Sequence, residues 1–199
     1  MQESFDNDSD GTLIADVLSG KTERFALIVL RYQRALLSVA KSRLGRDDWA
    51  EDVTQESFLC AFKSLKSYDS RYSFRTWLWT ILLNQCRRHY QKNQRKPQVN
   101  LWTDGQAGDD FSLEQESLLE SRVETAESQL IAKEQSEKLE RMFRMLPEAQ
   151  ADALRLRFYG GLKFQEIANA MNCSLSTAKN RVRWALTAIS EQLVLGERA

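Results

Sequence analysis

The chain has 199 residues, with 28 basic and 28 acidic side chains, one His and three Cys, and 42% of its residues are hydrophobic. This length and composition are typical of a globular protein with one large or two small domains. With one His and no paired Cys, a zinc site or a His-based hydrolytic centre is hard to build. We therefore predict no metal site, no cofactor and no catalytic residue.

The sequence carries no signal for a membrane or for export. No apolar run approaches the roughly 18 residues needed to span a bilayer. The N-terminal sequence MQESFDNDSD lacks the basic and apolar regions of a signal peptide. We expect a cytoplasmic protein, in which Cys60, Cys86 and Cys173, which lie within helical patterns, are buried or semi-exposed reduced thiols.

Helix breakers are scarce, with two Pro and eight Gly in the whole chain. Residues 46–96, 109–146 and 162–195 contain neither of them. Because Pro and Gly are the strongest breakers, these long uninterrupted stretches predict helices rather than short strands and turns. The expected fold class is all-α.

Residues 11–97 are predicted to form one compact domain of four helices, marked by apolar residues at spacings of three and four. The predicted helices run from Leu13 to Leu18 with Gly20 as the C′ residue, from Lys21 or Thr22 to Gly45, from Asp47 or Asp48 to about Ser67, and from the cap Ser73 onward. The side chains expected to point inward from the third helix are Val53, Phe58, Leu59, Phe62 and Leu65.

Opposite charges are segregated into adjacent blocks around Pro97, which breaks the fourth helix. Residues 70–103 contain no acid, whereas residues 98–128 contain eight acids and one Arg. The basic block predicts a surface for a polyanion, a role that the acidic segment cannot share. We expect residues 98–130 to form an acidic linker. The basic side chains of the first block are Arg71, Arg75, Arg87, Arg88, Lys92, Arg95 and Lys96.

Residues 131–195 are predicted to form a second helical domain. Pro147 takes the first position of a helix that stops at Gly160 and Gly161. Two apolar patterns follow, separated by a polar turn in which Asn172 accepts the left-handed conformation, and they predict a helix-turn-helix. An ordinary helical hairpin with solvated charges is the alternative. The side chains left to read base edges and hold phosphates are Ser176, Thr177, Lys179, Asn180, Arg181, Arg183 and Trp184.

Two blocks carry a resemblance to a known family. The first contains AEDVTQESFLCAFKSLKSY and SFRTWLWTILLNQCRRHYQKNQRK, and the second is LPEAQADALRLRFYGGLKFQEIANAMNCSLSTAKNRVRWAL. In this order they resemble the extracytoplasmic-function (ECF, group IV) sigma factors of bacterial RNA polymerase, in the sigma-70 family. The resemblance implies a sigma-2-like domain over residues 11–97 and a sigma-4-like helix-turn-helix domain over residues 131–195, joined by the acidic linker.

The resemblance implies a site for core RNA polymerase on the third predicted helix. In the family, this helix binds a basic coiled coil of the β′ clamp. An exposed acidic face formed by Asp52 and Glu56 at a spacing of four is the simpler interpretation of the pattern. The matching residues are Glu51, Asp52, Val53, Gln55, Glu56 and Phe58.

The resemblance also implies a site that recognises and melts minus-10 DNA, where the loop from Ser67 to Tyr72 captures an extruded base. Aromatic faces suit this role because stacking stabilises an unpaired base. Arg88 departs from the family, which often has Asp at that position, while Phe74 and Trp77 lie on a stripe expected to be mainly core. The residues implied are Tyr68, Arg71, Tyr72, Arg75, Trp79, Asn84, Arg87, Arg88, Lys92 and Arg95.

In the second block, the positions that commonly meet the minus-35 major groove in the family correspond to Lys179, Asn180, Arg183 and Trp184, and those that contact the backbone correspond to Thr177 and Arg181. Trp184 stands where Arg is frequent, and Ser176 replaces a common Gly. An indole has a single donor, so Trp184 cannot make the bidentate pair of Arg with guanine. Arg155 and Arg157 are expected either to touch phosphate or to be solvated helix charges.

The function expected from the resemblance is that of a sigma factor, a specificity subunit and not an enzyme. Its partners would be the β′ clamp and β flap of core RNA polymerase, promoter DNA and an anti-sigma factor, with no small-molecule substrate. The acidic linker would run through the RNA-exit region of the polymerase. One rival is a dimeric helix-turn-helix regulator that does not join polymerase. The other is a DNA-processing enzyme, which would need carboxylates near the basic surface.

Overall fold

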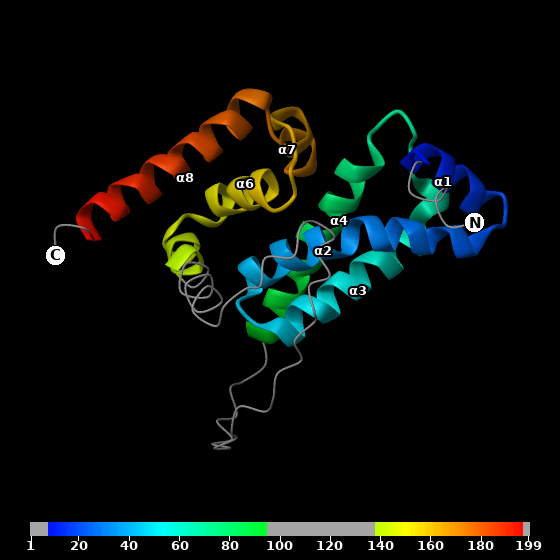
Figure 1. Cartoon of the computed structure of the whole chain (residues 1–199), viewed down its shortest axis with the longest axis horizontal. Helices are drawn as coiled ribbons and strands as arrows, with labels where there is room; N and C mark the ends of the chain where they lie inside the picture. Colours follow the sequence, from blue (N-terminus) through cyan, green and yellow to red (C-terminus); the bar gives the residue numbers. More distant parts are fainter. Residues whose placement is uncertain (1–7, 95–137, 197–199) are drawn as a thin grey trace, which may run out of the picture.

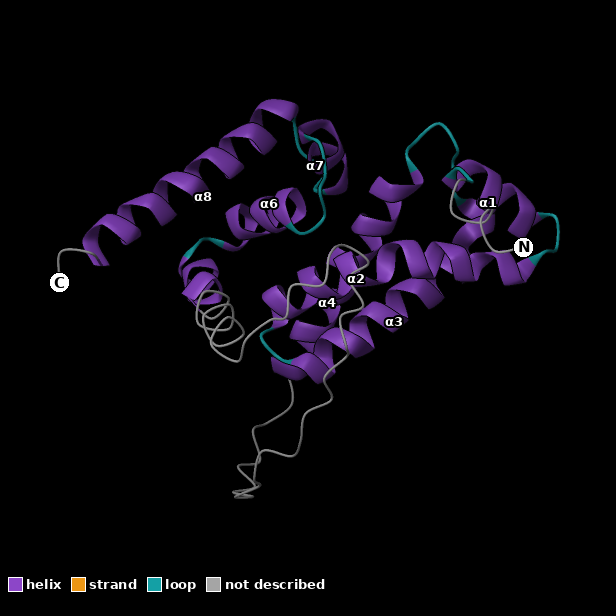
Figure 2. Cartoon of the chain, viewed as in Figure 1, coloured by secondary structure: helices purple, strands orange, loops and turns teal. Residues whose placement is uncertain are grey.

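The computed structural model describes residues 8–94 and 138–196, in which the regular secondary structure is entirely helical (Figures 1 and 2). This confirms the all-α prediction for the described residues. The predicted linker 98–130, Arg95 and the start of the second predicted domain lie outside them. The helices are α1 (Asp10–Leu18), α2 (Phe25–Leu44), α3 (Asp47–Ser64), α4 (Phe74–Gln94), α6 (Glu148–Phe158), α7 (Phe164–Ala170) and α8 (Leu175–Gly196), with short 3-10 turns η1 (Thr22–Arg24) and η2 (Leu65–Ser67).

The N-terminal unit, residues 8–94, is a bundle in which α2 packs against both α3 and α4, and α1 covers one end (Figure 1). Its core contains Leu36, Val39, Leu78 and Leu82, all fully buried. The α2 helix ends at Gly45, which has a left-handed φ of 69° and whose N–H donates to the carbonyl of Lys41 at 2.9 Å. This C-terminal cap turns the chain directly into α3.

The C-terminal unit, residues 138–196, confirms the predicted helix-turn-helix. A helical segment over residues 138–145 precedes α6, and α8 packs on both α6 and α7. Asn172 has a φ of 50°, the left-handed turn that joins α7 to α8. At the start of α8, the N–H of Thr177 donates to the hydroxyl of Ser174 at 3.1 Å, a cap that fixes the first turn.

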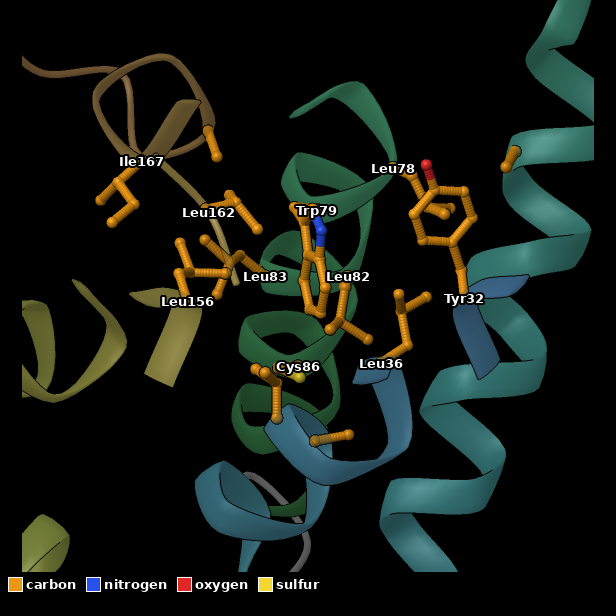
Figure 3. Close-up of a cluster of buried hydrophobic side chains, with 14 of the residues drawn as sticks. Tyr32, Leu36, Leu78, Trp79, Leu82, Leu83, Cys86, Leu156, Leu162 and Ile167 are labelled. Atoms are coloured by element: carbon orange, nitrogen blue, oxygen red, sulfur yellow. The ribbon is translucent and has the colours of Figure 1, made fainter. Parts of the chain in front are cut away.

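The cores of the two units form one continuous buried cluster. In Figure 3, Trp79 of α4 lies with Leu156 and Leu162 of the C-terminal unit on one side and Leu36 of α2 on the other. Trp79, Leu156 and Leu162 are all fully buried. The sequence analysis did not predict this contact between the two units.

Three local predictions are wrong. Leu59 and Phe62 were expected to point inward but are 50% and 39% exposed, because they lie beside the buried stripe of α3 and not on it. Pro147 precedes α6 as its N-cap, since its ψ of 136° is outside the helical range. Arg155 is buried, at 5% exposure, and is neither solvated nor free for phosphate.

Within residues 8–94 and 138–196, no helix is long and apolar enough to cross a membrane.

Candidate polymerase and nucleic-acid interfaces

The outer side of α3 presents four polar residues on two successive turns, which we call the acidic edge: Glu51, Asp52, Gln55 and Glu56. All four are exposed. Val53 and Phe58, which were predicted to share the polymerase site, are instead buried at 3% and 8% exposure. They hold α3 on the core while the acidic edge faces outward, so these two residues support the surface from inside and do not belong to it.

The loop between η2 and α4 places two tyrosines in different environments. Tyr72 is 61% exposed. Tyr68 is half-buried, with its ring centroid 5.6 Å from that of Phe74 and 5.2 Å from that of Trp77. The Tyr68 hydroxyl donates to the carbonyl of Tyr72, which links the two residues across the loop. Tyr68 is thus packed on neighbouring aromatic rings, whereas the ring of Tyr72 is exposed to solvent.

Arg71 in this loop is held by Asp69, a residue that the sequence analysis did not single out. The Nη2 atom of Arg71 lies 2.6 Å from a carboxylate oxygen of Asp69, and the Asp69 side chain also accepts the backbone N–H of Arg71 at 3.0 Å. These hydrogen bonds hold the pKa of the Asp69 carboxyl below its ordinary value. Because both residues are near the surface, the pair orients Arg71 without burying it.

Two of the predicted minus-10 residues are engaged between the units. Trp79 is fully buried, so its predicted contact with DNA is not available in this structure. Arg75 is half-buried and its guanidinium donates to the carbonyl of Gly160 in the C-terminal unit. The sequence around Trp79 gives no sign of this burial, because the residues that cover it, Leu156 and Leu162, lie far along the chain.

The exposed basic residues of α4 divide between two grooves. Asn84 and Arg87 line a cleft of about 790 Å³ between α4 and the C-terminal unit. Arg88 and Lys92 line a second groove, between α4 and the acidic edge of α3. The basic residues of α4 therefore belong to two separate surfaces.

The first turns of α8 present the predicted minus-35 residues. Lys179, Arg183 and Trp184 are exposed, and Trp184 retains half of its surface. Buried Ala178 and Val182 anchor the opposite side of the helix. Ser176 is exposed as well, whereas Thr177, Asn180 and Arg181 are half-buried.

Among the residues that the structure describes, no group of three or more His, Cys, Asp or Glu side chains is arranged to hold a metal ion. The surfaces consist of one acidic edge, an aromatic loop, a basic helix and an exposed recognition helix. A helix-turn-helix of this kind reads DNA in the major groove with the exposed residues of its second helix.

Comparison with known proteins assigns both units to one family. A family model of sigma-70 region 2 matches residues 28–96, and a model of sigma-70 region 4 matches residues 136–189. The RNA polymerase sigma-H factor of Pseudomonas aeruginosa is 30% identical over 186 residues, which cover 94% of each chain. The ECF RNA polymerase sigma-E factor of Salmonella typhimurium is 29% identical over 185 residues, covering 93% of this chain and 94% of that protein.

The fold agrees with this relationship. It is similar to that of the sigma factor in the complex of RpoE with the anti-sigma factor NepR from Bartonella quintana, with a TM-score of 0.61 and 23% identity, covering 85% of this chain and 96% of that one. The two matched regions follow one another here in the order of the helical units. The chain belongs to the sigma-70 family of transcription initiation factors, in its extracytoplasmic-function group.

Proposed function

We propose that this chain joins core RNA polymerase and directs initiation at promoters that carry minus-35 and minus-10 elements. The observation that supports this most is the exposed acidic edge of α3, because carboxylates beside a basic helix repel DNA phosphates and so are not explained by DNA binding. A polymerase partner with a basic surface accounts for them. RNA synthesis stays with the core enzyme, in the cytoplasm, and we assign no catalytic step to this chain.

In this proposal the acidic edge docks on a basic coiled coil of the β′ clamp. Asp52 and Glu56 lie one helical turn apart and are both exposed, so they can meet two cations on a facing helix. Leu59, 50% exposed, continues the same side of α3 and adds apolar contact. The β flap would hold the C-terminal unit.

The aromatic loop is proposed to act after docking, when the minus-10 duplex opens. Tyr72 offers an exposed ring to an unpaired base, and Tyr68 supports the loop from below through its contacts with Phe74 and Trp77. Stacking of a base on an aromatic side chain is worth roughly 1–3 kcal/mol. Arg71 and Arg87 would hold the neighbouring backbone phosphates.

The exposed face of α8 is proposed to read the minus-35 element in the major groove. Asn180 and Arg183 are the base-reading side chains, since their amide and guanidinium groups make bidentate pairs with adenine and guanine. Arg181, half-buried at the side of the helix, would hold phosphate. Trp184 would pack on sugar or on a thymine methyl.

We also propose control by an anti-sigma factor. The structurally similar RpoE is bound to its anti-sigma factor NepR in its solved complex. The present chain has the same order of helical units and a cleft between them, lined by Asn84, Arg87 and Arg181. An inhibitor bound there would cover residues of both proposed DNA sites at once.

The polymerase interaction is tested by reversing the charge of the acidic edge. The Asp52→Lys/Glu56→Lys variant should lose binding to core RNA polymerase, measured by co-purification and by fluorescence anisotropy. The matched control is Glu23→Lys, which reverses an exposed carboxylate of η1 outside the acidic edge. Normal binding of the double variant would contradict the polymerase assignment.

A further inference from the structure

The carboxylate of Asp10, at the start of α1, is bonded to two successive residues of α2. Arg31 donates from Nη1 to Asp10 Oδ1 at 2.6 Å, and the hydroxyl of Tyr32 donates to Oδ2 at 2.5 Å. Tyr32 is buried, at 9% exposure, and the Asp10 side chain is 23% exposed. Each oxygen of this carboxylate therefore has a partner within the N-terminal unit.

The buried hydroxyl of Tyr32 depends on this acceptor. Burial, together with the hydrogen bond to Asp10 and the charge of Asp10, raises the pKa of Tyr32 above its ordinary value. The phenol is therefore protonated at neutral pH and donates its proton to the carboxylate. Because a buried hydroxyl without an acceptor is unfavourable, loss of the carboxylate should shift the ring of Tyr32.

The ring of Tyr32 is connected to the aromatic loop through Phe74, the first residue of α4. The Phe74 ring centroid lies 6.4 Å from that of Tyr32 and 5.6 Å from that of Tyr68, separations at which aromatic rings are in contact. Tyr68 in turn donates its hydroxyl proton to the carbonyl of Tyr72. A continuous series of contacts thus runs from the carboxylate of Asp10 to the exposed residue of the loop.

The α1 helix also lies next to this loop. It contacts both η2 and α4, and Figure 1 shows it beside the segment that joins them. Burial, followed by the negative charges of Asp10 and Asp69, raises the pKa of the Tyr68 hydroxyl, so the field of Asp10 reaches the loop. Fully buried Leu13 and nearly buried Ile14 hold α1 on the bundle. The carboxylate is thus not needed merely to attach α1.

We propose that Asp10 is a positioning residue for the loop between η2 and α4. Through Tyr32 and Phe74 it holds Tyr68, and thereby the exposed ring of Tyr72, in the orientation that accepts an unpaired base. This inference rests on the proposed function of the loop and adds a residue that does not itself touch DNA. A loop that is ordered before melting accepts a base without the entropic cost of ordering at that step.

A second role of Asp10 has to be separated from this one. Asp10 lies in the first turn of α1, where a carboxylate stabilises a helix by its interaction with the helix dipole. Tyr32→Phe removes only the hydroxyl and leaves the carboxylate and its pairing with Arg31 in place. Positioning predicts the same defect for Asp10→Asn and Tyr32→Phe, whereas helix stabilisation predicts it for Asp10→Asn alone.

Hydrogen exchange of the full chain without polymerase is the first measurement. In the structure, the N–H groups of Arg71 and Tyr72 both donate to Asp69 at 3.0 Å, which protects the loop amides. Asp10→Asn and Tyr32→Phe should each raise the exchange rate over residues 68–73 about tenfold, read by mass spectrometry of the peptides that cover the loop. A tenfold change corresponds to about 1.4 kcal/mol.

The matched control is Asp16→Asn. Asp16 lies in the same helix and its side chain is 23% exposed, as is that of Asp10, but it pairs with Lys21 and Arg24 near the other end of α1. This variant should leave exchange of the loop unchanged. Asp10→Glu, which retains the charge and both acceptor oxygens, should restore most of the protection.

Promoter opening with core polymerase is the second measurement. Asp10→Asn and Tyr32→Phe should form the closed complex with wild-type affinity but open it about tenfold more slowly, as followed by permanganate reactivity of the minus-10 thymines over time. The double variant should open no more slowly than either single variant, because both substitutions break the same contact.

The two measurements fail in distinguishable ways. Unchanged loop exchange in Asp10→Asn and Tyr32→Phe, or an equal change in Asp16→Asn, would overturn the positioning role. Normal promoter opening by variants with altered loop exchange would overturn the contribution of Asp10 to melting. A wild-type chain that opens no promoter with core polymerase would contradict the proposed function, whereas hydrogen exchange without polymerase would still decide whether Asp10 positions the loop.

Discussion

Arg87 and Arg88 are adjacent in α4 but face different partners. Arg87 lines the cleft toward the C-terminal unit, together with Asn84 and Arg181, whereas Arg88 lines the groove toward α3, together with Asp52 and Glu56. Neighbouring positions in a helix are about 100° apart around its axis, so two successive arginines serve two surfaces. The position at which this chain departs from the family pattern therefore belongs to the groove beside the acidic edge.

The first prediction separates these two arginines. Arg87→Ala should weaken promoter binding by the polymerase complex and reduce the salt slope of log K by about 0.9, the loss of one phosphate contact. Arg88→Ala should leave that slope nearly unchanged and alter affinity for core polymerase instead, because it changes the charge beside the acidic edge. Binding titrations over a series of salt concentrations measure both quantities. Equal salt slopes for the two variants would contradict the division.

The second prediction concerns the aromatic loop. Tyr72→Ala should leave closed-complex formation nearly intact but reduce permanganate reactivity of the minus-10 thymines, since a stacking partner worth roughly 1–3 kcal/mol is lost. Tyr68→Ala should also lower the melting temperature of the protein, because Tyr68 packs on Phe74 and Trp77. Normal promoter opening by Tyr72→Ala would exclude base capture by this residue.

The third prediction concerns the recognition helix. Asn180→Ala and Arg183→Ala should each cost roughly 1–3 kcal/mol at one minus-35 base pair and relax the preference there. Arg181→Ala should instead weaken all sequences alike. A matrix of promoter variants distinguishes the two behaviours, and unchanged preferences for both Asn180→Ala and Arg183→Ala would show that another face of α8 reads the DNA.

The fourth prediction concerns thiol reactivity. Burial raises the pKa of the Cys86 thiol to about 12, so at pH 8 almost none of it is the reactive thiolate. Iodoacetamide at that pH should modify Cys60 and Cys173 of the folded chain while leaving Cys86 intact, as counted by mass spectrometry. In guanidinium chloride all three should react. Rapid alkylation of Cys86 in the folded protein would contradict its burial in the core.

The end of α2 and the turn between α7 and α8 could be predicted from the sequence because each depends on residues close by in the chain. Gly45 ends α2 through a hydrogen bond to Lys41, four residues earlier. Asn172 makes the turn between α7 and α8 in the left-handed conformation that Asn tolerates. The exposed acidic edge and the exposed face of α8 also follow from helical periodicity.

The contact between the units could not be predicted because its partners are distant in the chain. Arg155 and Ser42 are 113 residues apart, and an arginine in a helix is ordinarily solvated. The burial of Trp79 depends in the same way on Gly160 and Leu162, whose covering role has no periodic signal. The burial of Val53 and Phe58, by contrast, could be predicted from the apolar stripe of α3. Only the family resemblance placed these two residues at the polymerase surface.

Reconstituted transcription tests the central claim most directly. Core RNA polymerase is supplied with a promoter library, with and without the full chain, and the transcripts are sequenced. We predict that the chain directs initiation downstream of two spaced sequence elements and that Asp52→Lys/Glu56→Lys abolishes this. A chain that binds duplex DNA by itself, and leaves the start sites chosen by core polymerase unchanged, would contradict the assignment as a promoter-specificity subunit.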